Sequence, residues 1–195
     1  MKYMKDFTSH FKERNSFTIR DARIFLKEKK ISNKYLHFLI HSLLKKGMLK
    51  RLSRGVYTFK NDIIVAGFAF KPFYYGLQQA LSLHNLWQQA TNPVIITTKK
   101  ARSGVRKIME SNVVVKRIKP SMFYGFEQVK HFEHWVPVST IEKTIIDFAY
   151  FKQKLPQEAK KQALKKANSK KMQELLKKAP KWVKKRIKKV LQEKS

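Results

Sequence analysis

The stretch from residue 43 to residue 59 constrains the fold of this chain more than any other part of its sequence. It reads Leu-Leu-Lys-Lys-Gly-Met-Leu-Lys-Arg-Leu-Ser-Arg-Gly-Val-Tyr-Thr-Phe. Gly47 follows the last apolar positions of a helical pattern, where glycine can adopt the left-handed conformation that ends a helix. Ser53, Arg54 and Gly55 then separate two short apolar runs, which predicts a β-hairpin. Because the two helical patterns immediately upstream lead into this hairpin, the order of elements predicts an N-terminal winged helix-turn-helix.

Three helices are expected before the hairpin, over residues 3–13, 18–29 and 33–46. Thr18 can cap the second, with Asp21 in its first turn, and Ser32 can cap the third. The third helix separates into two faces by the 3.6-residue period. Its apolar face carries Leu36, Leu39, Ile40 and Leu43, and its polar face carries Lys34, His37, Phe38, His41 and Lys45. That polar face suits either an ordinary solvated surface or a recognition helix, and the hairpin that follows favours the recognition helix.

The expected ligand is duplex DNA. Backbone amides at the start of the third helix can hold a phosphate, its polar face can enter the major groove, and arginine on the hairpin can enter a narrow minor groove. The predicted DNA contacts are Ser32, Asn33, Lys34, His37, His41, Lys45, Lys50, Arg51 and Arg54. For Phe38, on the same polar face, we expect a contact inside the protein rather than with thymine methyl groups.

The charge of the chain agrees with a phosphate polymer as partner. Lys and Arg number 44 against 13 Asp and Glu, which gives a formal net charge of +31. RNA suits the same charge, and an anionic membrane surface is a further alternative. The longest apolar run, residues 63–70, is too short to span a bilayer, and the N-terminus lacks the apolar stretch of a signal peptide. We therefore expect a cytoplasmic protein that does not bind membranes.

The basic residues are concentrated at the two ends of the chain. Residues 1–60 have a net charge of +12, residues 61–150 of +5, and residues 151–195 of +14. The fold class predicted is α+β, in three parts: the winged helix-turn-helix (1–60), a small mixed α+β domain (61–150) and a basic helical extension (151–195). Strands are expected over 93–98 and 112–118 and near 123–126, 127–132 and 135–138. Helices are expected from Pro72, after Ser139, and on either side of Pro180.

The usual signatures of enzymes are missing from the sequence. There are no cysteines and no glycine-rich phosphate loop, and the middle domain lacks the Glu-x-Lys triplet of metal-dependent nucleases. His37 and His41 have a spacing that can bind metal, but no glutamate follows the first of them. We expect no enzymatic activity, no metal and no cofactor. An RNA-binding protein and a divergent nuclease that uses Glu142 remain the alternative functions.

The polar residues of the middle domain have local explanations. Ser139 and Glu142 form the Ser-x-x-Glu pattern of a capping box. Lys143 is expected to be solvated, and Asp147 to accept a local hydrogen bond. The aromatic residues Tyr74, Tyr75 and Trp87 are expected in the core rather than stacked on bases. No catalytic group is predicted from these residues.

Three blocks of the sequence, however, resemble a known family, the abortive-infection E-type (AbiEi-like) antitoxins of two-gene toxin–antitoxin systems. The first block is the hairpin region, residues 44–57. The second, residues 74–86, is similar to a small-residue helix that ends in His-Gly-Leu, with Asn85 in place of the glycine. Asn85 is compatible because asparagine also enters left-handed conformations. The third, residues 138–147, is similar to the family's Glu-Lys-Thr-Ile-Asp signature.

The resemblance covers about residues 10–150 and implies a type IV toxin–antitoxin system. It implies a winged helix that represses its own operon by binding repeats in its promoter. It also implies a C-terminal domain that acts as antitoxin in functional pairing with a nucleotidyltransferase-like toxin. The antitoxin-domain motif residues carried over are Tyr75, Gly76, Ala80, His84, Glu142, Lys143 and Asp147. The basic extension lies outside the resemblance.

Overall fold

The computed structural model describes residues 3–192 and has a mixed α+β fold with two sheets. It divides the chain into two compact units, where the sequence predicted three parts. One unit comprises residues 1–71 with 107–112, and the other comprises residues 72–106 with 113–195. The helices of the basic extension belong to the second unit, together with the larger sheet.

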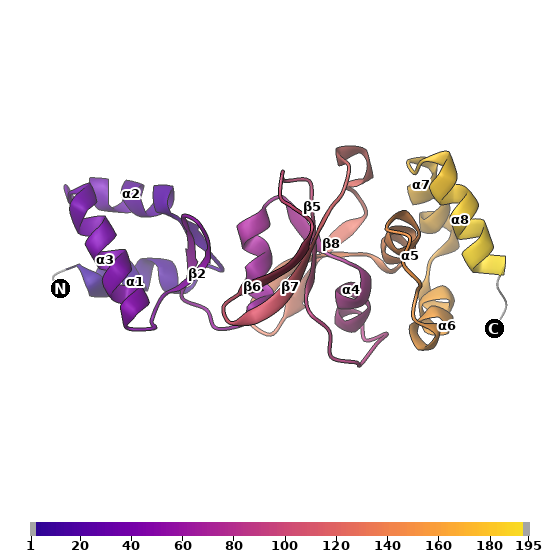
Figure 1. Ribbon diagram of the computed structural model, residues 1–195, viewed down its shortest axis with the longest axis horizontal. Helices are drawn as coiled ribbons and strands as arrows, with labels where there is room; N and C mark the ends of the chain where they lie inside the picture. Colours follow the sequence, from indigo (N-terminus) through magenta and orange to yellow (C-terminus); the bar gives the residue numbers. More distant parts are fainter. Residues whose placement is uncertain (1–2, 193–195) are drawn as a thin grey trace. The chain divides into compact units, whose positions relative to one another are not determined.

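The described part of the first unit contains three α-helices and a small antiparallel sheet (Figure 1). The helices are α1 (Met4–Lys12), α2 (Ile19–Glu28) and α3 (Asn33–Lys45). The strands β1 (Phe17–Thr18), β2 (Lys50–Ser53) and β3 (Val56–Thr58) form a sheet in the order β1-β3-β2. Each helix lies within the range that its periodicity predicted, and β2 and β3 form the expected hairpin. Gly47 and Gly55 have positive φ angles of 68° and 77°, as helix-ending and turn positions require.

Local side-chain interactions fix the ends of α2 and α3. The Thr18 hydroxyl accepts from the backbone N–H of Asp21 at 3.1 Å, and the Asp21 carboxylate accepts from the N–H of Thr18 at 2.7 Å. Ser32 accepts from the N–H of Tyr35 at 3.4 Å and begins α3. Between the helices, Lys30 has a φ of 55°, which turns the chain within four residues. The predicted apolar face of α3 is confirmed, since Leu36, Leu39, Ile40 and Leu43 are buried in a core with Phe7, Phe11 and Phe17.

A 3₁₀ helix, η1 (Ile63–Phe70), closes this unit, in a run expected to be helix or linker. The carboxylate of Asp62 accepts from the N–H of Ile64 at 2.9 Å and so caps the element. Six of its eight residues are buried, which explains the almost wholly apolar sequence.

The second unit is built on a six-stranded mixed sheet. Its strands are β4 (Phe73–Tyr75), β5 (Val94–Thr97), β6 (Gly104–Ile108), β7 (Ser111–Arg117), β8 (Phe126–His131) and β9 (His134–Ser139). They are arranged in the order β6-β7-β5-β4-β9-β8. The central strand β4 runs antiparallel to β5 and parallel to β9, and β5 runs parallel to β7. The turn between β6 and β7 groups with the first unit.

The helices of this unit are α4 (Leu77–Leu83), α5 (Ile141–Tyr150), α6 (Gln157–Lys166), α7 (Ser169–Lys177) and α8 (Lys181–Gln192), with a 3₁₀ turn η2 (Pro120–Met122). In Figure 1, α5 lies between the sheet and the pair α7 and α8, and it contacts α6, α7 and α8. Val183 and Ile187 of α8 are buried in the same core as Ile96 and Ile145. The basic extension is therefore an integral layer of this unit.

The structure corrects several predictions for this part of the chain. Residues 73–75 form a strand instead of starting a helix at Pro72, because they pair with residues 95–97 of β5. The strand expected near 123–126 is wrong, because residues 123–125 form a loop between η2 and the start of β8 at Phe126. Strand β6 was not predicted at all. The cap of α5 is Thr140, one residue after the predicted Ser139, which ends β9. The extension folds into three helices rather than two because Asn168 caps an additional start at α7.

Candidate nucleic-acid interface

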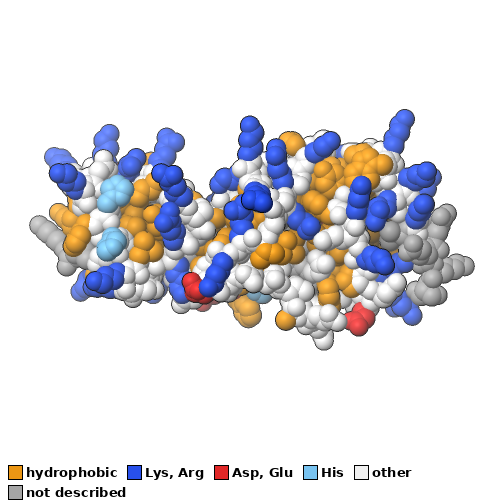
Figure 2. All heavy atoms as spheres, viewed as in Figure 1, with side chains coloured by type: hydrophobic (Ala, Val, Ile, Leu, Met, Phe, Trp, Pro, Cys, Tyr) orange, Lys and Arg blue, Asp and Glu red, His pale blue; other side chains and the backbone are white. Residues whose placement is uncertain are grey.

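The polar face of α3 is exposed along its whole length. Lys34, His37, His41 and Lys45 are all exposed, and basic side chains far outnumber acidic ones on the face shown in Figure 2. Phe38 lies among them with 59% of its surface exposed. The internal contact that we expected for Phe38 is wrong, because the core of the unit packs against the opposite face of the helix. The exposed ring leaves an apolar group in the middle of a cationic surface.

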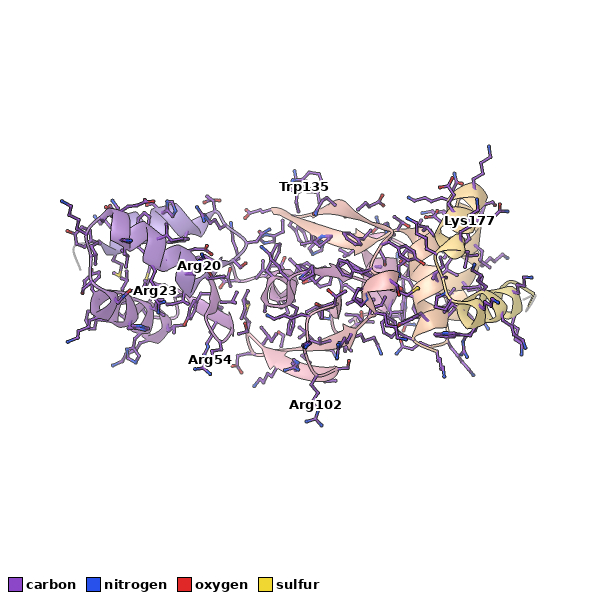
Figure 3. All side chains as sticks on the ribbon, turned by 90° about the horizontal axis from the view of Figure 1, so that it is seen from above. Arg20, Arg23, Arg54, Arg102, Trp135 and Lys177 are labelled. Carbon is purple, nitrogen blue, oxygen red and sulfur yellow. The ribbon has the colours of Figure 1, made fainter. Side chains whose placement is uncertain are left out.

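The N-terminus of α3 adjoins a group of cations that the sequence analysis missed. Ser32 and Asn33 are exposed there, and they line a hollow of about 460 Å³ with side chains of α2. Three of those side chains are cationic, Arg20, Arg23 and Lys27, the two arginines being labelled in Figure 3. Their three- and four-residue spacing was a usable signal, since it places them on one face of a helix. The start of a helix and three cations together form a surface suited to phosphate.

The hairpin presents its basic residues in three different environments. Arg54 lies at the turn, exposed, and its side chain projects outward in Figure 3. Arg51 is exposed, and its Nε donates to the carbonyl of Ser53 at 3.3 Å, which holds the side chain along the strand. Lys50 is half-buried. Glu110, in the same unit, is an acidic neighbour of Lys50. The hydrogen bond and charge of Lys107 lower the pKa of the Glu110 carboxyl, and the charge of Lys50 adds a smaller effect.

The hairpin is anchored to the helices by backbone hydrogen bonding. The N–H of Ile19 donates to the carbonyl of Gly55 at 2.8 Å, which joins the start of α2 to the hairpin turn. Strand β1 pairs with β3 through Phe17 opposite Tyr57. The position of Arg54 relative to α2 is therefore determined by main-chain contacts. The predicted DNA contacts belong to one unit and lie on α3, at its start and on this hairpin.

The antitoxin-domain motif residues form a different kind of site, in the interior of the second unit. Lys143 and Asp147 make an ion pair one helical turn apart, and both side chains have 0% exposure. The hydroxyl of Tyr74 donates to Asp147 Oδ2 at 3.0 Å and accepts from Lys143 Nζ at 3.1 Å. The expectation that Lys143 is solvated is wrong. Its ammonium group faces into the core because Asp147 and Tyr74 provide the partners that a buried charge needs.

Burial controls the ionisation of this cluster. It raises the pKa of Asp147 and lowers that of Lys143, and in each case the charge of the other partner opposes the shift. Burial, with the charge of Asp147, also raises the pKa of Tyr124 to about 12. The ammonium lies 5.1 Å from the ring centre of Tyr124 and 5.4 Å from that of Tyr74. Aromatic rings therefore surround the ion pair, and its complete burial indicates a role in stabilising the core.

The remaining motif residues join β4, α4, β9 and α5. The ring of His84 makes a 2.8 Å hydrogen bond to the carbonyl of Ser139, and the hydroxyl of Ser139 donates to the carbonyl of Tyr75 at 3.3 Å. Ala80 is buried, and a side chain at Gly76 would collide with Ile96. Asn85 has a left-handed φ of 56°, a conformation that asparagine tolerates in place of the family's glycine. The second and third sequence blocks thus meet in the structure.

Glu142 has a longer-range partner than the capping box predicted. Its carboxylate accepts from the backbone N–H of Asn168 at 2.8 Å, and Lys171 lies 3.8 Å away. Burial alone would raise the pKa of the Glu142 carboxyl. The hydrogen bonds from the backbone N–H groups of Asn168 and Glu142 and the charge of Lys171 outweigh the effect of burial, so the pKa lies below its usual 4.5. Glu142 therefore fastens the start of α7 to the start of α5.

Residues 3–192 contain neither a metal-binding cluster nor a membrane-spanning helix. No group of three or more His, Cys, Asp or Glu side chains in that range is arranged to hold a metal ion. None of the helices described there has the length and apolar character that crossing a membrane requires.

Comparison with known proteins supports the fold but gives no family. No family model and no curated protein matches the sequence. Among solved structures, the chain is similar to the RV2827C protein from Mycobacterium tuberculosis, with a TM-score of 0.61 and 14% sequence identity. The match covers 90% of this chain and 71% of that one. At this identity the similarity concerns the fold alone.

Proposed function

We propose that this protein is a transcription regulator that binds duplex DNA through a winged helix-turn-helix formed by its first sixty residues. The observation that carries the proposal is the exposed basic face of α3, with Lys34, His37, His41 and Lys45, next to a hairpin that carries Arg51 and Arg54. The α2–turn–α3 arrangement followed by a hairpin has the order of that motif. The net charge of +31 supports a nucleic acid as the partner.

In this proposal each part of the first unit has a distinct contact. The polar face of α3 enters the major groove, where His37 and His41 reach base edges and Phe38 meets thymine methyl groups. The start of α3, with Arg20 and Arg23 of α2, holds a backbone phosphate. Arg54 at the hairpin turn enters the adjacent minor groove. Phosphate contacts supply most of the affinity, and the few base contacts supply the specificity.

We further propose that the regulator is an autorepressor and the antitoxin of a toxin–antitoxin pair, acting in the cytoplasm on its own promoter. This rests on the resemblance of three sequence blocks to the AbiEi-like antitoxins. Hydrogen bonds from Ser139 to Tyr75 and from Lys143 to Tyr74 join the second and third blocks, which supports a shared role for them in one framework. A nucleotidyltransferase-like toxin is the proposed functional partner, and its gene is expected beside this one.

The test of DNA binding is a titration of the protein against a labelled duplex of its own upstream region, read by fluorescence anisotropy. Arg51→Ala with Arg54→Ala is expected to weaken binding by tenfold or more, since a base or groove contact contributes about 1–3 kcal/mol. Lys99→Ala with Lys100→Ala removes the same charge from exposed positions of the other unit and serves as the control. If both double variants weaken DNA binding equally, the hairpin does not make a specific contact with the duplex.

The same titration distinguishes DNA from RNA, and a separate co-expression experiment tests the antitoxin role. A structured RNA competitor at equal salt should displace the duplex poorly, and efficient displacement would favour the RNA-binding alternative. The logarithm of affinity should fall with the logarithm of salt concentration at about −0.9 per phosphate contacted. For the antitoxin role, the product of the neighbouring gene is expressed alone and together with this protein. We expect co-expression to restore the growth that the toxin stops, and a failure to restore growth would contradict the antitoxin role.

A further inference from the structure

The helix α8 carries a large aromatic side chain that the core of the second unit does not cover. Val183 and Ile187 of this helix face inward and are 0% and 1% exposed, whereas Trp182 keeps 44% of its surface exposed. Tryptophan side chains are highly buried on average. An indole left this open on a well-packed helix is therefore available for a contact outside the chain.

Two aromatic residues at the end of α5 hold this indole in place. The ring centres of Trp182 and Tyr150 are 5.6 Å apart, with an angle of 31° between the ring planes. Phe151 meets Tyr150 edge-on, with its ring centre 5.1 Å away. The hydroxyl of Tyr150 accepts from the backbone N–H of Lys119 at 3.5 Å. Because these contacts order the rings in the free protein, stacking on Trp182 costs little additional side-chain entropy.

Cations border the indole on both elements that meet there. The ammonium of Lys152, in the loop after α5, lies 6.0 Å from the centre of the Trp182 ring. Three further cations follow Trp182 by three, four and seven positions and share its side of α8: Lys185, Arg186 and Lys189. The two lysines are exposed and the arginine is half-buried. Neither residues 151–156 nor residues 181–192 include an Asp or a Glu.

An exposed indole bordered by cations has the chemistry that an unpaired nucleotide requires. A base can stack on the ring, and solvated lysines beside the ring can contact the phosphates on either side of that base. A duplex offers the indole no such partner along its length, because neighbouring base pairs cover the faces of its bases. The combination of ring and charge therefore favours a single strand over a double helix.

We propose that this surface, here called the Trp182 surface (Tyr150, Lys152, Trp182, Lys185 and Lys189), binds single-stranded RNA. Trp182 stacks on a base, and the lysines contact the flanking phosphates. RNA is the source of unpaired bases because its loops and ends present them, whereas DNA presents them only where its duplex has been opened. The proposal concerns the second unit and does not rest on duplex DNA binding by the first.

The test titrates the full chain against a labelled oligoadenylate of about ten nucleotides, read by fluorescence anisotropy, since single-strand sites typically cover about 4–16 nucleotides. Trp182→Leu removes the ring but keeps an apolar side chain, and it should weaken binding at least about fivefold. Trp182→Phe keeps a ring for stacking and should change the affinity by less than about threefold. The control is Trp135→Leu on β9, at a tryptophan 58% exposed and labelled in Figure 3, which should bind as the wild type does.

The contribution of charge is tested by a matched pair of double variants. Lys185→Gln with Lys189→Gln removes two cations of the Trp182 surface and should weaken oligoadenylate binding by about threefold or more at a salt concentration of about 0.15 M. Lys161→Gln with Lys165→Gln removes two exposed cations at the same spacing from α6 and should have the smaller effect.

A fluorescence titration keeps the test independent of any loss of stability in the Trp182→Leu variant. Stacking on a base quenches the emission of an indole, so oligoadenylate should quench the tryptophan emission of the wild type. The quenching should persist in Trp135→Phe and disappear in Trp182→Phe, although both variants keep an aromatic ring.

Three results would overturn the proposal. One is equal affinity of the Trp182→Leu and Trp135→Leu variants for oligoadenylate. Another is a duplex RNA of the same length that binds the wild type as tightly as oligoadenylate does, which would mean that charge alone attracts the strand. The third is tighter binding of oligodeoxyadenylate, which would assign the surface to opened DNA. Arg51→Ala with Arg54→Ala should weaken duplex DNA binding and leave oligoadenylate binding unchanged, so failure of DNA binding and failure of this proposal are distinguishable.

Discussion

The buried pair of Lys143 and Asp147 gives the most quantitative prediction. Asp147→Ala leaves the Lys143 ammonium at 0% exposure with the Tyr74 hydroxyl as its remaining hydrogen-bond partner in the cluster. Removing one partner of a buried ion pair typically destabilises a protein by about 3–5 kcal/mol, because the other charge stays uncompensated. For a chain of this size the melting temperature should fall by roughly 10 °C. Urea unfolding followed by circular dichroism measures the loss.

A second variant separates the cost of an unpaired charge from the cost of disturbed packing. Lys143→Met, Asp147→Leu and Tyr74→Phe together remove both charges and the hydroxyl that joins them while keeping similar side-chain volumes. This triple variant should be within about 2 kcal/mol of the wild type, since apolar replacement of a whole buried pair is often nearly neutral. A loss below about 1 kcal/mol for Asp147→Ala, the range of an exposed pair, would refute the reasoning. So would a triple variant as unstable as the single one.

Two other predictions concern the helices that follow α5. Glu142→Gln should destabilise the protein by about 1 kcal/mol at pH 7. Because the pKa of Glu142 is depressed in the folded state, its contribution is present above pH 4.5 and is lost as the pH falls through the folded pKa. The difference between variant and wild type in urea unfolding should therefore disappear in acid, and a difference that persists would contradict the Asn168 contact. Ile187→Ala should destabilise the second unit by about 2–5 kcal/mol, since this α8 side chain is 1% exposed. An unchanged unfolding curve would mean that the basic extension is not part of the core.

Elements determined by neighbouring residues could be predicted from the sequence. The cap at Thr18, the apolar face of α3 and the hairpin at Gly55 depend on interactions within a few positions, and each was predicted. Strand β4 was missed because it is formed by pairing: Tyr74 and Tyr75 suit an apolar helix equally well until Ile96 and Ile95 lie beside them.

The candidate sites show the same difference between features set by neighbouring residues and features set by long-range contacts. The exposure of Lys34 and His41 followed from the period of one helix. The burial of Lys143 could not be predicted in this way, because one of its partners, Tyr74, is 69 residues away. The cations of α2 were missed for a different reason. Their spacing was visible, but only the fold places Arg20 and Arg23 beside the start of α3.

The central claim is that the first unit binds duplex DNA through α3 and its hairpin. Because the chain has no cysteine, Met48→Cys, at an exposed position between α3 and β2, allows an iron chelate to be attached at a single site. Phe132→Cys, at a residue 79% exposed in the other unit, is the matched control. With the protein's own upstream DNA, the chelate at position 48 should cut both strands at a few discrete positions that repeat with the spacing of the binding sites. Uncut DNA, or cutting no more localised than from position 132, would contradict the claim.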